Sequence, residues 1–226
     1  MPRIARVVAA GYPHHITQRG NYRQRIFSSD IDRKKYLSHL KNESKSYGLV
    51  ILAYCLMPNH VHFIVIPEKE DSMGNVFKYA HMKYSQYYNK KMCTQGHLFQ
   101  GRFFSSVMDE RHTLACARYI ERNPVRAKMA KNPNMWNWSS AKTHSGIDKH
   151  DELGVNRLFD YIEEKQKNWG KFIELSDDSN EIKQIREQTR KGRPLGSNNF
   201  IFELEGKLKR FLKLKPKGRP KKRIEK

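Results

Sequence analysis

The sequence has no hydrophobic run long enough to cross a membrane. Its longest apolar stretch, residues 49–66, is interrupted by Tyr54, by Pro58-Asn59 and by two histidines, whereas a membrane-spanning helix needs about 20 consecutive apolar residues. The N-terminal residues also lack the apolar core of a signal peptide. We therefore expect a cytoplasmic protein with no membrane partner.

Cysteine is scarce. The three cysteines are Cys55, Cys93 and Cys116, and no two of them form a CxxC pair. An odd and widely spaced set excludes a disulfide framework and gives no cysteine-based zinc site. The cysteine usage therefore indicates a reducing compartment.

Acidic residues are few compared with basic ones. The chain has 23 Asp and Glu against 44 Lys and Arg, which gives a formal net charge of +21. Cations at this density favour a polyanionic partner, and nucleic acid is the first candidate. We therefore expect association with the nucleoid. Hydrophobic residues make up 38% of the chain, which is enough for a core and excludes a wholly disordered protein.

The positive charge is concentrated in the last 41 residues. They contain 15 Lys and Arg against 4 Glu, so they carry +11 of the +21. Two Gly-Arg-Pro segments, which begin at Gly192 and Gly218, predict extended arms because Gly is flexible and Pro lacks an amide donor. Between them, four apolar residues at spacings of four, four and three predict a short amphipathic helix over residues 199–214.

A polar and aperiodic segment at residues 145–151 predicts a domain boundary. We therefore expect one main domain over residues 1–145, a helical linker region over residues 146–191, and a basic DNA-binding tail over residues 192–226.

The order of elements in the first 145 residues predicts the fold class. Alternation and β-branched content predict strands at residues 14–19, 49–57, 60–66 and 98–108, with a turn at Pro58-Asn59. Apolar spacing predicts helices at residues 30–47, capped by Asp30, and at residues 72–90 and 110–122. The order β-α-β-β-α-β plus a helix is that of an α+β, ferredoxin-like sandwich with an antiparallel sheet and helices on its faces.

The clearest chemical feature is the segment His60-Val61-His62. Side chains on a strand alternate between faces, so the two imidazoles project from one side about 7 Å apart. They are suited to bind one divalent cation. A pair of partly buried histidines that only form hydrogen bonds has the same pattern, and metal binding requires a third ligand.

A second feature lies on the predicted helix at residues 110–122. Tyr119 and Asn123 are four residues apart and therefore share one helix face, while Leu114, Ala117 and Ile120 form a separate apolar stripe. The amide oxygen of Asn123 is a hard metal ligand, and the phenol of Tyr119 is a potential nucleophile. Taken alone, a packing tyrosine followed by an Asn-Pro helix stop explains the same residues.

The two features together resemble a known family. Residues 57–64, Met-Pro-Asn-His-Val-His-Phe-Ile, precede Tyr-Ile-x-x-Asn-Pro-Val at residues 119–125, and this combination is similar to the REP-associated tyrosine transposases. These are relatives of the IS200-type insertion-sequence transposases within the HUH single-strand DNA nucleases. The resemblance extends over residues 1–145, including the segments at residues 14–21 and 138–140.

The resemblance implies a role for each matched residue. His60 and His62 match the metal-binding histidines, Tyr119 matches the nucleophile, and Asn123 falls where relatives carry a third ligand. The implied cofactor is Mg²⁺ or Mn²⁺, which would polarise the scissile phosphate. The implied product is a 5′-phosphotyrosine with a free 3′-hydroxyl, so the protein would be both an endonuclease and a strand transferase.

The implied substrate is single-stranded DNA next to a hairpin of the repetitive extragenic palindrome (REP) type. Single strands bind to cationic and aromatic surfaces, and Arg19, Gln100 and Arg102 are the preferred contacts because they flank family-like segments. The Gly-Arg-Pro arginines are candidates for an A·T-rich minor groove. The full set of predicted DNA contacts is Arg19, Asn21, Gln100, Arg102, Arg122, Arg126, Arg193 and Arg219.

Two other functions fit parts of the sequence. A non-catalytic DNA-binding protein would use the basic tail, and a metal-dependent hydrolase would use water in place of Tyr119. The sequence leaves open whether the protein is a monomer or a dimer.

Overall fold

The structure is a computed structural model that describes residues 5–162 and 166–212. Its strands are β1 (His14–Arg19), β2 (Leu49–Met57), β3 (His60–Pro67) and β4 (Phe104–Val107). Its longer helices are α1 (Asp30–Tyr47), α2 (Ser72–Met92), α3 (Glu110–Glu121), α6 (Gln166–Glu174), α7 (Ser179–Lys191) and α8 (Asn198–Leu208). Short helices are α4 (Asn123–Arg126) and α5 (Ala141–His144), with 3-10 turns at Asn21–Arg23, Pro133–Met135 and Val155–Asp160.

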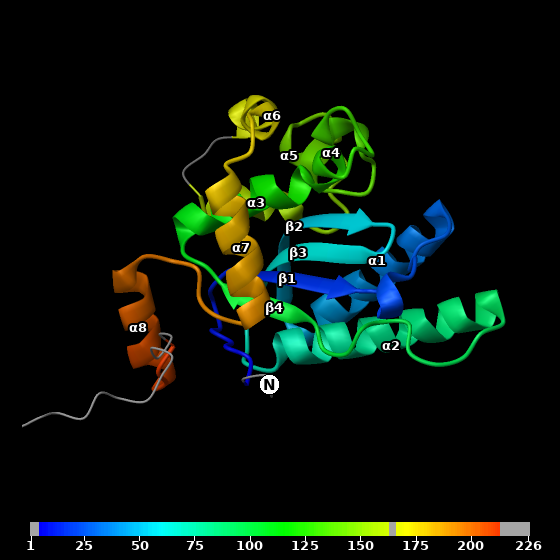
Figure 1. Ribbon diagram of the computed structural model, residues 1–226, viewed down its shortest axis with the longest axis horizontal. Helices are drawn as coiled ribbons and strands as arrows, with labels where there is room; N and C mark the ends of the chain where they lie inside the picture. Colours follow the sequence, from blue (N-terminus) through cyan, green and yellow to red (C-terminus); the bar gives the residue numbers. More distant parts are fainter. Residues whose placement is uncertain (1–4, 163–165, 213–226) are drawn as a thin grey trace, which may run out of the picture.

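The four strands form one antiparallel sheet in the order β2-β3-β1-β4 (Figure 1). Strands β1 and β3 occupy the centre of the sheet. This strand order is the one expected for a ferredoxin-like sandwich with the element order β-α-β-β-α-β. The predicted ferredoxin-like α+β fold is therefore confirmed. Five of the predicted elements, β1, α1, β2, β3 and α3, agree with the structure to within one residue.

Helix α1 shows how local sequence sets an element's bounds. Ser29, not the predicted Asp30, caps it, because the Ser29 side chain accepts from the Asp32 amide while the Asp32 carboxylate accepts from the Ser29 amide. Gly48 ends the helix in the left-handed conformation, with a φ of 65°. The chain then enters β2 directly.

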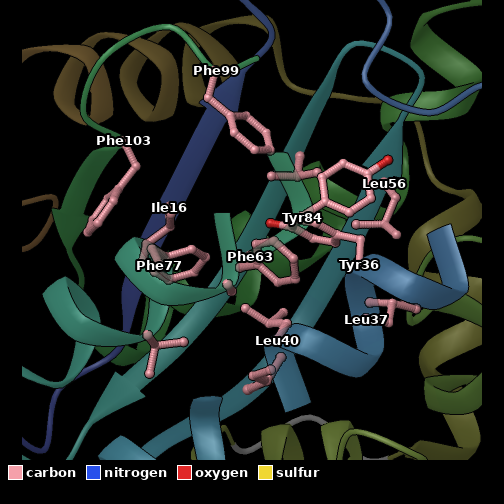
Figure 2. Packing of buried hydrophobic residues seen from close by; sticks show 14 of the residues in the cluster. Ile16, Tyr36, Leu37, Leu40, Leu56, Phe63, Phe77, Tyr84, Phe99 and Phe103 are labelled. Atoms are coloured by element: carbon pink, nitrogen blue, oxygen red, sulfur yellow. The ribbon is translucent and has the colours of Figure 1, made fainter. Parts of the chain in front are cut away.

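One face of the sheet packs on α1 and α2 through an apolar core. Figure 2 shows its centre, where Phe63 of β3 lies among Tyr36, Phe77 and Tyr84 from the two helices. Ile16 of β1 belongs to the same cluster. This core holds the sheet and fixes the positions of β1 and β3 from one side.

The opposite face of the sheet packs on α3, α5 and α6. Ile64 and Ile66 of β3 lie there with Ile120 of α3, Trp169 of α6 and Ile185 of α7. Helices α6 and α7 contact α3, so residues from the predicted linker region cover the main domain rather than extending from it. The division of the chain into separate units stays a prediction.

The fourth strand is shorter than predicted. Residues 98–108 were expected to form it, but β4 begins only at Phe104. Before it, the chain crosses the end of β1 through the hydrogen bond from the Gln100 amide to the Arg19 carbonyl, and Gly101 has a φ of 52°. Leu98, Phe99 and Phe103 are all buried. Their apolar side chains give residues 98–103 the composition of a strand, although the chain there does not have the period of two.

The first Gly-Arg-Pro segment, predicted to be an extended arm, packs against the sheet. It runs beside β4, where Ser106 donates to the Arg193 carbonyl and the Leu195 amide donates to the Val107 carbonyl. The Arg193 guanidinium donates to the Leu212 carbonyl. The second segment, with Arg219, lies outside the described residues.

Helix α8 follows this segment near the β4 edge of the sheet (Figure 1), and its Leu204 shares a buried apolar cluster with Val107 of β4. It covers Asn198–Leu208, shorter than the predicted 199–214, because Lys209 takes a left-handed conformation with a φ of 47°. Leu204 packs on Val7 and Ala9 near the N-terminus. No helix in residues 5–162 or 166–212 is both long and apolar enough to span a membrane.

Candidate active site

A cavity of about 620 Å³ opens on the sheet face that lies beneath α3 and α7. It brings together residues from β1, β3, the loop before β4, and helices α3, α4 and α7. Its lining residues are His15, Thr17, Arg19, Met57, His60, His62, Gln100, Phe104, Tyr119, Asn123, Arg126, Ala127, Arg186, Thr189 and Arg190.

The two histidines of β3 converge in this cavity as predicted. Their ring centroids are 5.0 Å apart and the rings are nearly perpendicular. The Nδ1 atom of His60 bonds to the side-chain oxygen of Asn59 at 2.7 Å. This bond fixes the orientation of the His60 ring. Burial lowers the pKa of His60 to about 4. Burial, with the nearby His60, also lowers the pKa of His62 well below its usual value, so both rings are neutral at pH 7.

Tyr119 faces the histidines from α3. Asp109 caps this helix by accepting from the His112 amide, which fixes where the helix begins. The Tyr119 ring is buried and meets the His62 ring edge to face at 5.7 Å between centroids. Its hydroxyl accepts a hydrogen bond from Arg186 Nε at 3.3 Å, and the Arg126 guanidinium lies 4.3 Å from its ring centroid.

Asn123 lies one turn beyond Tyr119. Arg122 separates α3 from α4, but the turn continues through the bond from the Arg122 amide to the Arg118 carbonyl. The Asn123 side chain is buried in the cavity, and its Nδ2 atom has no hydrogen-bond partner. A buried amide nitrogen without a partner is costly unless an acceptor, such as a phosphate oxygen, completes it, and the oxygen of the same amide is the atom that would bind a cation.

These residues fit a hard divalent cation. Two neutral imidazoles and one amide oxygen form an open set, and oxygens of a bound phosphate would complete it, which suits Mg²⁺ or Mn²⁺. Across the part of the chain that the structure describes, no three His, Cys, Asp or Glu side chains cluster as a metal site. The amide of Asn123 is therefore needed to complete a three-residue set.

Two buried residues extend the histidine pair. His15 of β1 bonds through Nε2 to His62 Nδ1 at 3.0 Å, and through Nδ1 to Thr189 Oγ1 of α7 at 2.7 Å. Burial lowers the pKa of His15 to about 3. Sequence analysis did not assign a role to either residue, although His15 lies in a segment that resembles the family.

Four of the predicted DNA contacts, Asn21, Arg102, Arg122 and Arg193, do not line the cavity, and a fifth, Arg219, lies outside the described residues. Arg122 is turned to the Asp177 carboxylate at 2.9 Å and to the Ile173 carbonyl at 2.6 Å. Arg102 lines a second cavity, of about 520 Å³, between α2 and the loop before β4. The Asn21 amide donates to the Leu98 carbonyl, and Arg193 lies beside β4.

Three predicted DNA contacts do line the cavity, and α7 adds two cations that sequence analysis missed. The predicted ones are Arg19, Gln100 and Arg126. The added ones are Arg186 and Arg190, which are exposed. Their spacing with Thr189, at i, i+3 and i+4, places all three on one helix face. That spacing was the available signal, but it did not indicate which surface the helix covers.

A buried polar network supports α3 behind Tyr119. The Glu121 carboxylate is fully buried and accepts from Ser140, His144 and Trp169 at 2.5, 2.6 and 2.7 Å. Burial opposes protonation of His144, but the adjacent Glu121 carboxylate outweighs it and raises the pKa of His144. Three donors on one buried carboxylate hold α3, α5 and α6 in one arrangement.

The sequence and fold were compared with those of known proteins. Residues 9–123 match the family described as "Transposase IS200 like". The fold is similar to that of a REP-associated tyrosine transposase solved bound to a REP hairpin, with a TM-score of 0.56 and 17% identity over 70% of this chain and 93% of that chain. A putative transposase from Deinococcus radiodurans has a TM-score of 0.38 and 16% identity over 54% of this chain and 97% of that chain. No curated protein sequence matches the chain.

The shared fold and the matched sequence define the chain as a transposase-type protein. It belongs to the IS200-like transposase family, whose pattern covers just over half of the chain. The matched range contains His60, His62, Tyr119 and Asn123. It ends before α6 and α7, so the residues that these helices add to the site lie beyond it.

Proposed function

We propose that the protein is a metal-dependent single-stranded DNA endonuclease and strand transferase that forms a covalent 5′-phosphotyrosine. One observation carries the proposal: the hydroxyl-bearing Tyr119, two neutral histidines and Asn123, whose amide nitrogen has no partner, line the same cavity. A nucleophile beside an open set of metal ligands is the arrangement that phosphoryl transfer requires. Membership of a transposase family supports this choice over other phosphotransfer reactions.

The chain's residues divide the chemistry between them. Tyr119 Oη loses its proton and forms the bond to phosphorus, the bond from phosphorus to the 3′ oxygen breaks, and the departing 3′ oxygen takes up a proton to become the 3′-hydroxyl, so that no net proton is gained or lost. A bound Mg²⁺ or Mn²⁺ would polarise the scissile phosphate. His60, His62 and Asn123 are the residues that would hold it. A 3′-hydroxyl attacking the phosphotyrosine reverses the step, which joins strands without another energy source.

Two arginines are positioned to act on the phosphate. Arg186 donates to the Tyr119 hydroxyl, and Arg126 lies over the Tyr119 ring. Asp177 bonds to Arg126 at 3.3 Å and so holds its guanidinium against the tyrosine. Cations fixed next to the nucleophile stabilise the negative charge of the phosphate in the transition state.

The rim of the cavity supports binding of a single strand. Arg19, Gln100 and Arg190 are exposed there. The nearby Tyr22 is 93% exposed on a loop whose backbone bonds to the Pro58-Asn59 turn and to Leu98. Exposed cations together with an exposed aromatic side chain suit a flanking single strand. The similar REP-associated transposase was solved with a REP hairpin, and we propose a hairpin of this type as substrate.

The proposal is tested with labelled hairpin DNA that carries a single-stranded flank, incubated with Mg²⁺ or Mn²⁺ and separated by denaturing electrophoresis. The expected product is a protein-DNA adduct that depends on the added cation and disappears in EDTA. Cleavage without an adduct would indicate that water is the nucleophile. Binding without cleavage under either cation would leave a non-catalytic DNA-binding protein and overturn the enzymatic proposal.

A further inference from the structure

His15 is a buried polar residue that the proposed chemistry does not use directly. Both of its ring nitrogens have partners, Thr189 Oγ1 at 2.7 Å and His62 Nδ1 at 3.0 Å. The His15 and His62 rings are nearly parallel, with an interplanar angle of 5°. The three side chains form a continuous hydrogen-bonded row, the His62-His15-Thr189 chain.

The fold builds this row from three elements. In the pairing of β1 with β3, Thr17 lies opposite His62 and His15 lies opposite Ile64, so the two histidines are diagonal neighbours on one face. Helix α7 contacts β1 and β4 and supplies Thr189 (Figure 1). All three side chains of the row are at most 5% exposed, which shields the row from bulk water.

Proton counting allows the row two arrangements. In the first, His62 donates from Nδ1 to His15 Nε2, and His15 donates from Nδ1 to the Thr189 oxygen. In the second, Thr189 donates to His15 Nδ1, and His15 donates from Nε2 to His62. A hydroxyl is able to serve in either role, and a neutral imidazole carries one proton.

The two arrangements differ at the nitrogen that faces a cation. In the first, the proton of His62 lies on Nδ1 and the lone pair of Nε2 is available. In the second, the proton of His62 lies on Nε2, which then cannot bind a metal. We propose that His15 and Thr189 are positioning residues that hold His62 in the first arrangement when a divalent cation binds. This inference rests on the proposed role of His62 as a metal ligand.

The inference gives α7 a defined part in the site. Hydrogen bonds to the second nitrogen of a ligating histidine fix its tautomer and orientation. Here the last acceptor is Thr189, 66 residues beyond the end of the family match at residue 123. Cation affinity would therefore depend on Thr189, a residue outside the segment that matches the family.

The first test reads the tautomers directly. Imidazole ¹⁵N shifts of the full-length protein are recorded with and without saturating Mg²⁺, and signals are assigned through His15→Gln and His62→Gln variants. With Mg²⁺, we expect both His15 and His62 to carry their protons on Nδ1. A proton on Nε2 of His62 at saturation, or His62 signals that do not respond to Mg²⁺, would overturn the inference.

The second test removes the end of the row without changing its shape. Thr189→Val replaces the hydroxyl by a methyl group, and we expect Mn²⁺ affinity, measured by electron paramagnetic resonance titration, to fall about 10- to 100-fold. Thr189→Ser restores the oxygen and should restore affinity. Gln184→Ala, on an exposed part of the same helix, is the matched control. Equal Mn²⁺ affinity for the Val and Ser variants would contradict the inference.

A third variant separates this inference from the proposed function. Tyr119→Phe should keep the wild-type Mn²⁺ affinity and the same histidine tautomers while forming no adduct. If the wild-type protein forms no adduct but the Thr189 variants still differ in Mn²⁺ affinity, the enzymatic proposal fails and the positioning role stands. If adducts form but the Thr189 variants bind Mn²⁺ equally, the positioning role alone fails.

Discussion

The two faces of the sheet differ in chemistry although one strand contributes to both. On β3, Val61, Phe63 and Val65 enter the apolar core against α1 and α2. His60 and His62, which alternate with them, line the cavity beneath α3 and α7. Because side chains alternate along a strand, adjacent residues of β3 therefore belong to the apolar core and to the proposed active site in turn.

The difference between the faces also shows what a polar cavity requires around it. Apolar side chains on the first face need only contact and exclusion of water. On the second face, Glu121 takes three donors and Asp177 bonds to both Arg122 and Arg126. Buried charges need such partners, since an unpaired one is strongly destabilising. On this second face, which we call the chemical face, residues of the α6–α7 region supply such partners.

The largest expected effect comes from the smallest change on the chemical face. Tyr119→Phe removes one oxygen and should reduce cleavage by about a thousandfold or more, because the nucleophile is lost. Binding of the hairpin should stay nearly unchanged, since affinity comes from many phosphate contacts. Adduct formation and filter binding measure the two quantities. Wild-type adduct levels in this variant would refute the assignment of the nucleophile.

Neighbouring substitutions on β3 should have opposite effects. Phe63→Ala, on the apolar face, should lower the free energy of unfolding by about 3–5 kcal/mol through lost contacts and a cavity. His62→Ala, on the chemical face, should change stability far less but abolish cleavage, as should His60→Ala. Denaturant titration and the cleavage assay are run on both. If His62→Ala is as unstable as Phe63→Ala, strand alternation does not divide the two roles.

Sequence reasoning was strongest where a local repeat carried the information. The alternation of His60 and His62 with apolar residues predicted that both imidazoles share a face, and the i, i+4 spacing of Tyr119 and Asn123 predicted that they do too. The structure places all four in one cavity. Their catalytic and metal-binding roles remain predictions, because proximity alone does not establish them.

Sequence reasoning failed where a residue's place depends on distant contacts. Nothing local to Arg186 or Thr189 indicates that α7 packs on β1 and β4, and their spacing fits any solvated helix face. The first Gly-Arg-Pro segment has the composition of an extended arm, but the sequence does not indicate the hydrogen bonds with Ser106 and Val107 that hold it beside β4. Tertiary packing overrides local preference in both cases.

Residues 213–226 follow the last residue that we assign to either face of the sheet, so they can be removed without changing either face. Residues 213–226 carry eight Lys and Arg against one Glu, a net +7. A cut after Leu212 keeps α7 and the whole cavity, whereas a cut near residue 185 removes Thr189 and Arg186. We expect the protein cut after Leu212 to cleave DNA. Its slope of log affinity against log salt should be shallower than that of the full chain by up to about 5. An equal slope would exclude the tail from DNA binding.

The apolar face holds a histidine whose titration gives a smaller, pH-dependent effect. His81 is half-buried, stacks on Phe99 and bonds to the Tyr36 hydroxyl at 3.1 Å, and desolvation of its ring lowers its pKa to about 3. Below about pH 6.5 the unfolded chain binds a proton that the folded chain does not. The free energy of unfolding should therefore decrease as the pH is lowered from 6.5 to 3, by up to about 1.4 kcal/mol per pH unit.

Substitution checks this assignment. His81→Gln should make the acid limb of stability against pH shallower by about that amount, measured by urea unfolding between pH 4 and 7. His97→Gln alters an exposed histidine on the same side of the sheet and should leave the limb unchanged. Matching acid limbs for the wild-type protein and His81→Gln would show that His81 does not contribute.

The smallest effect is expected at the rim of the chemical face. Arg190→Ala removes one exposed cation beside the cavity while leaving the Tyr119, His60 and His62 side chains in place. If Arg190 neutralises one phosphate of the single strand, the slope of log affinity against log salt should become shallower by about 0.7. Lys183→Ala, an exposed residue of the same helix outside the cavity lining, is the charge-matched control. It should leave the slope unchanged, because a cation counts in the slope only where a phosphate displaces its counterions. Equal slopes for the two variants would mean that net charge, not the rim of this cavity, determines how the strand is held.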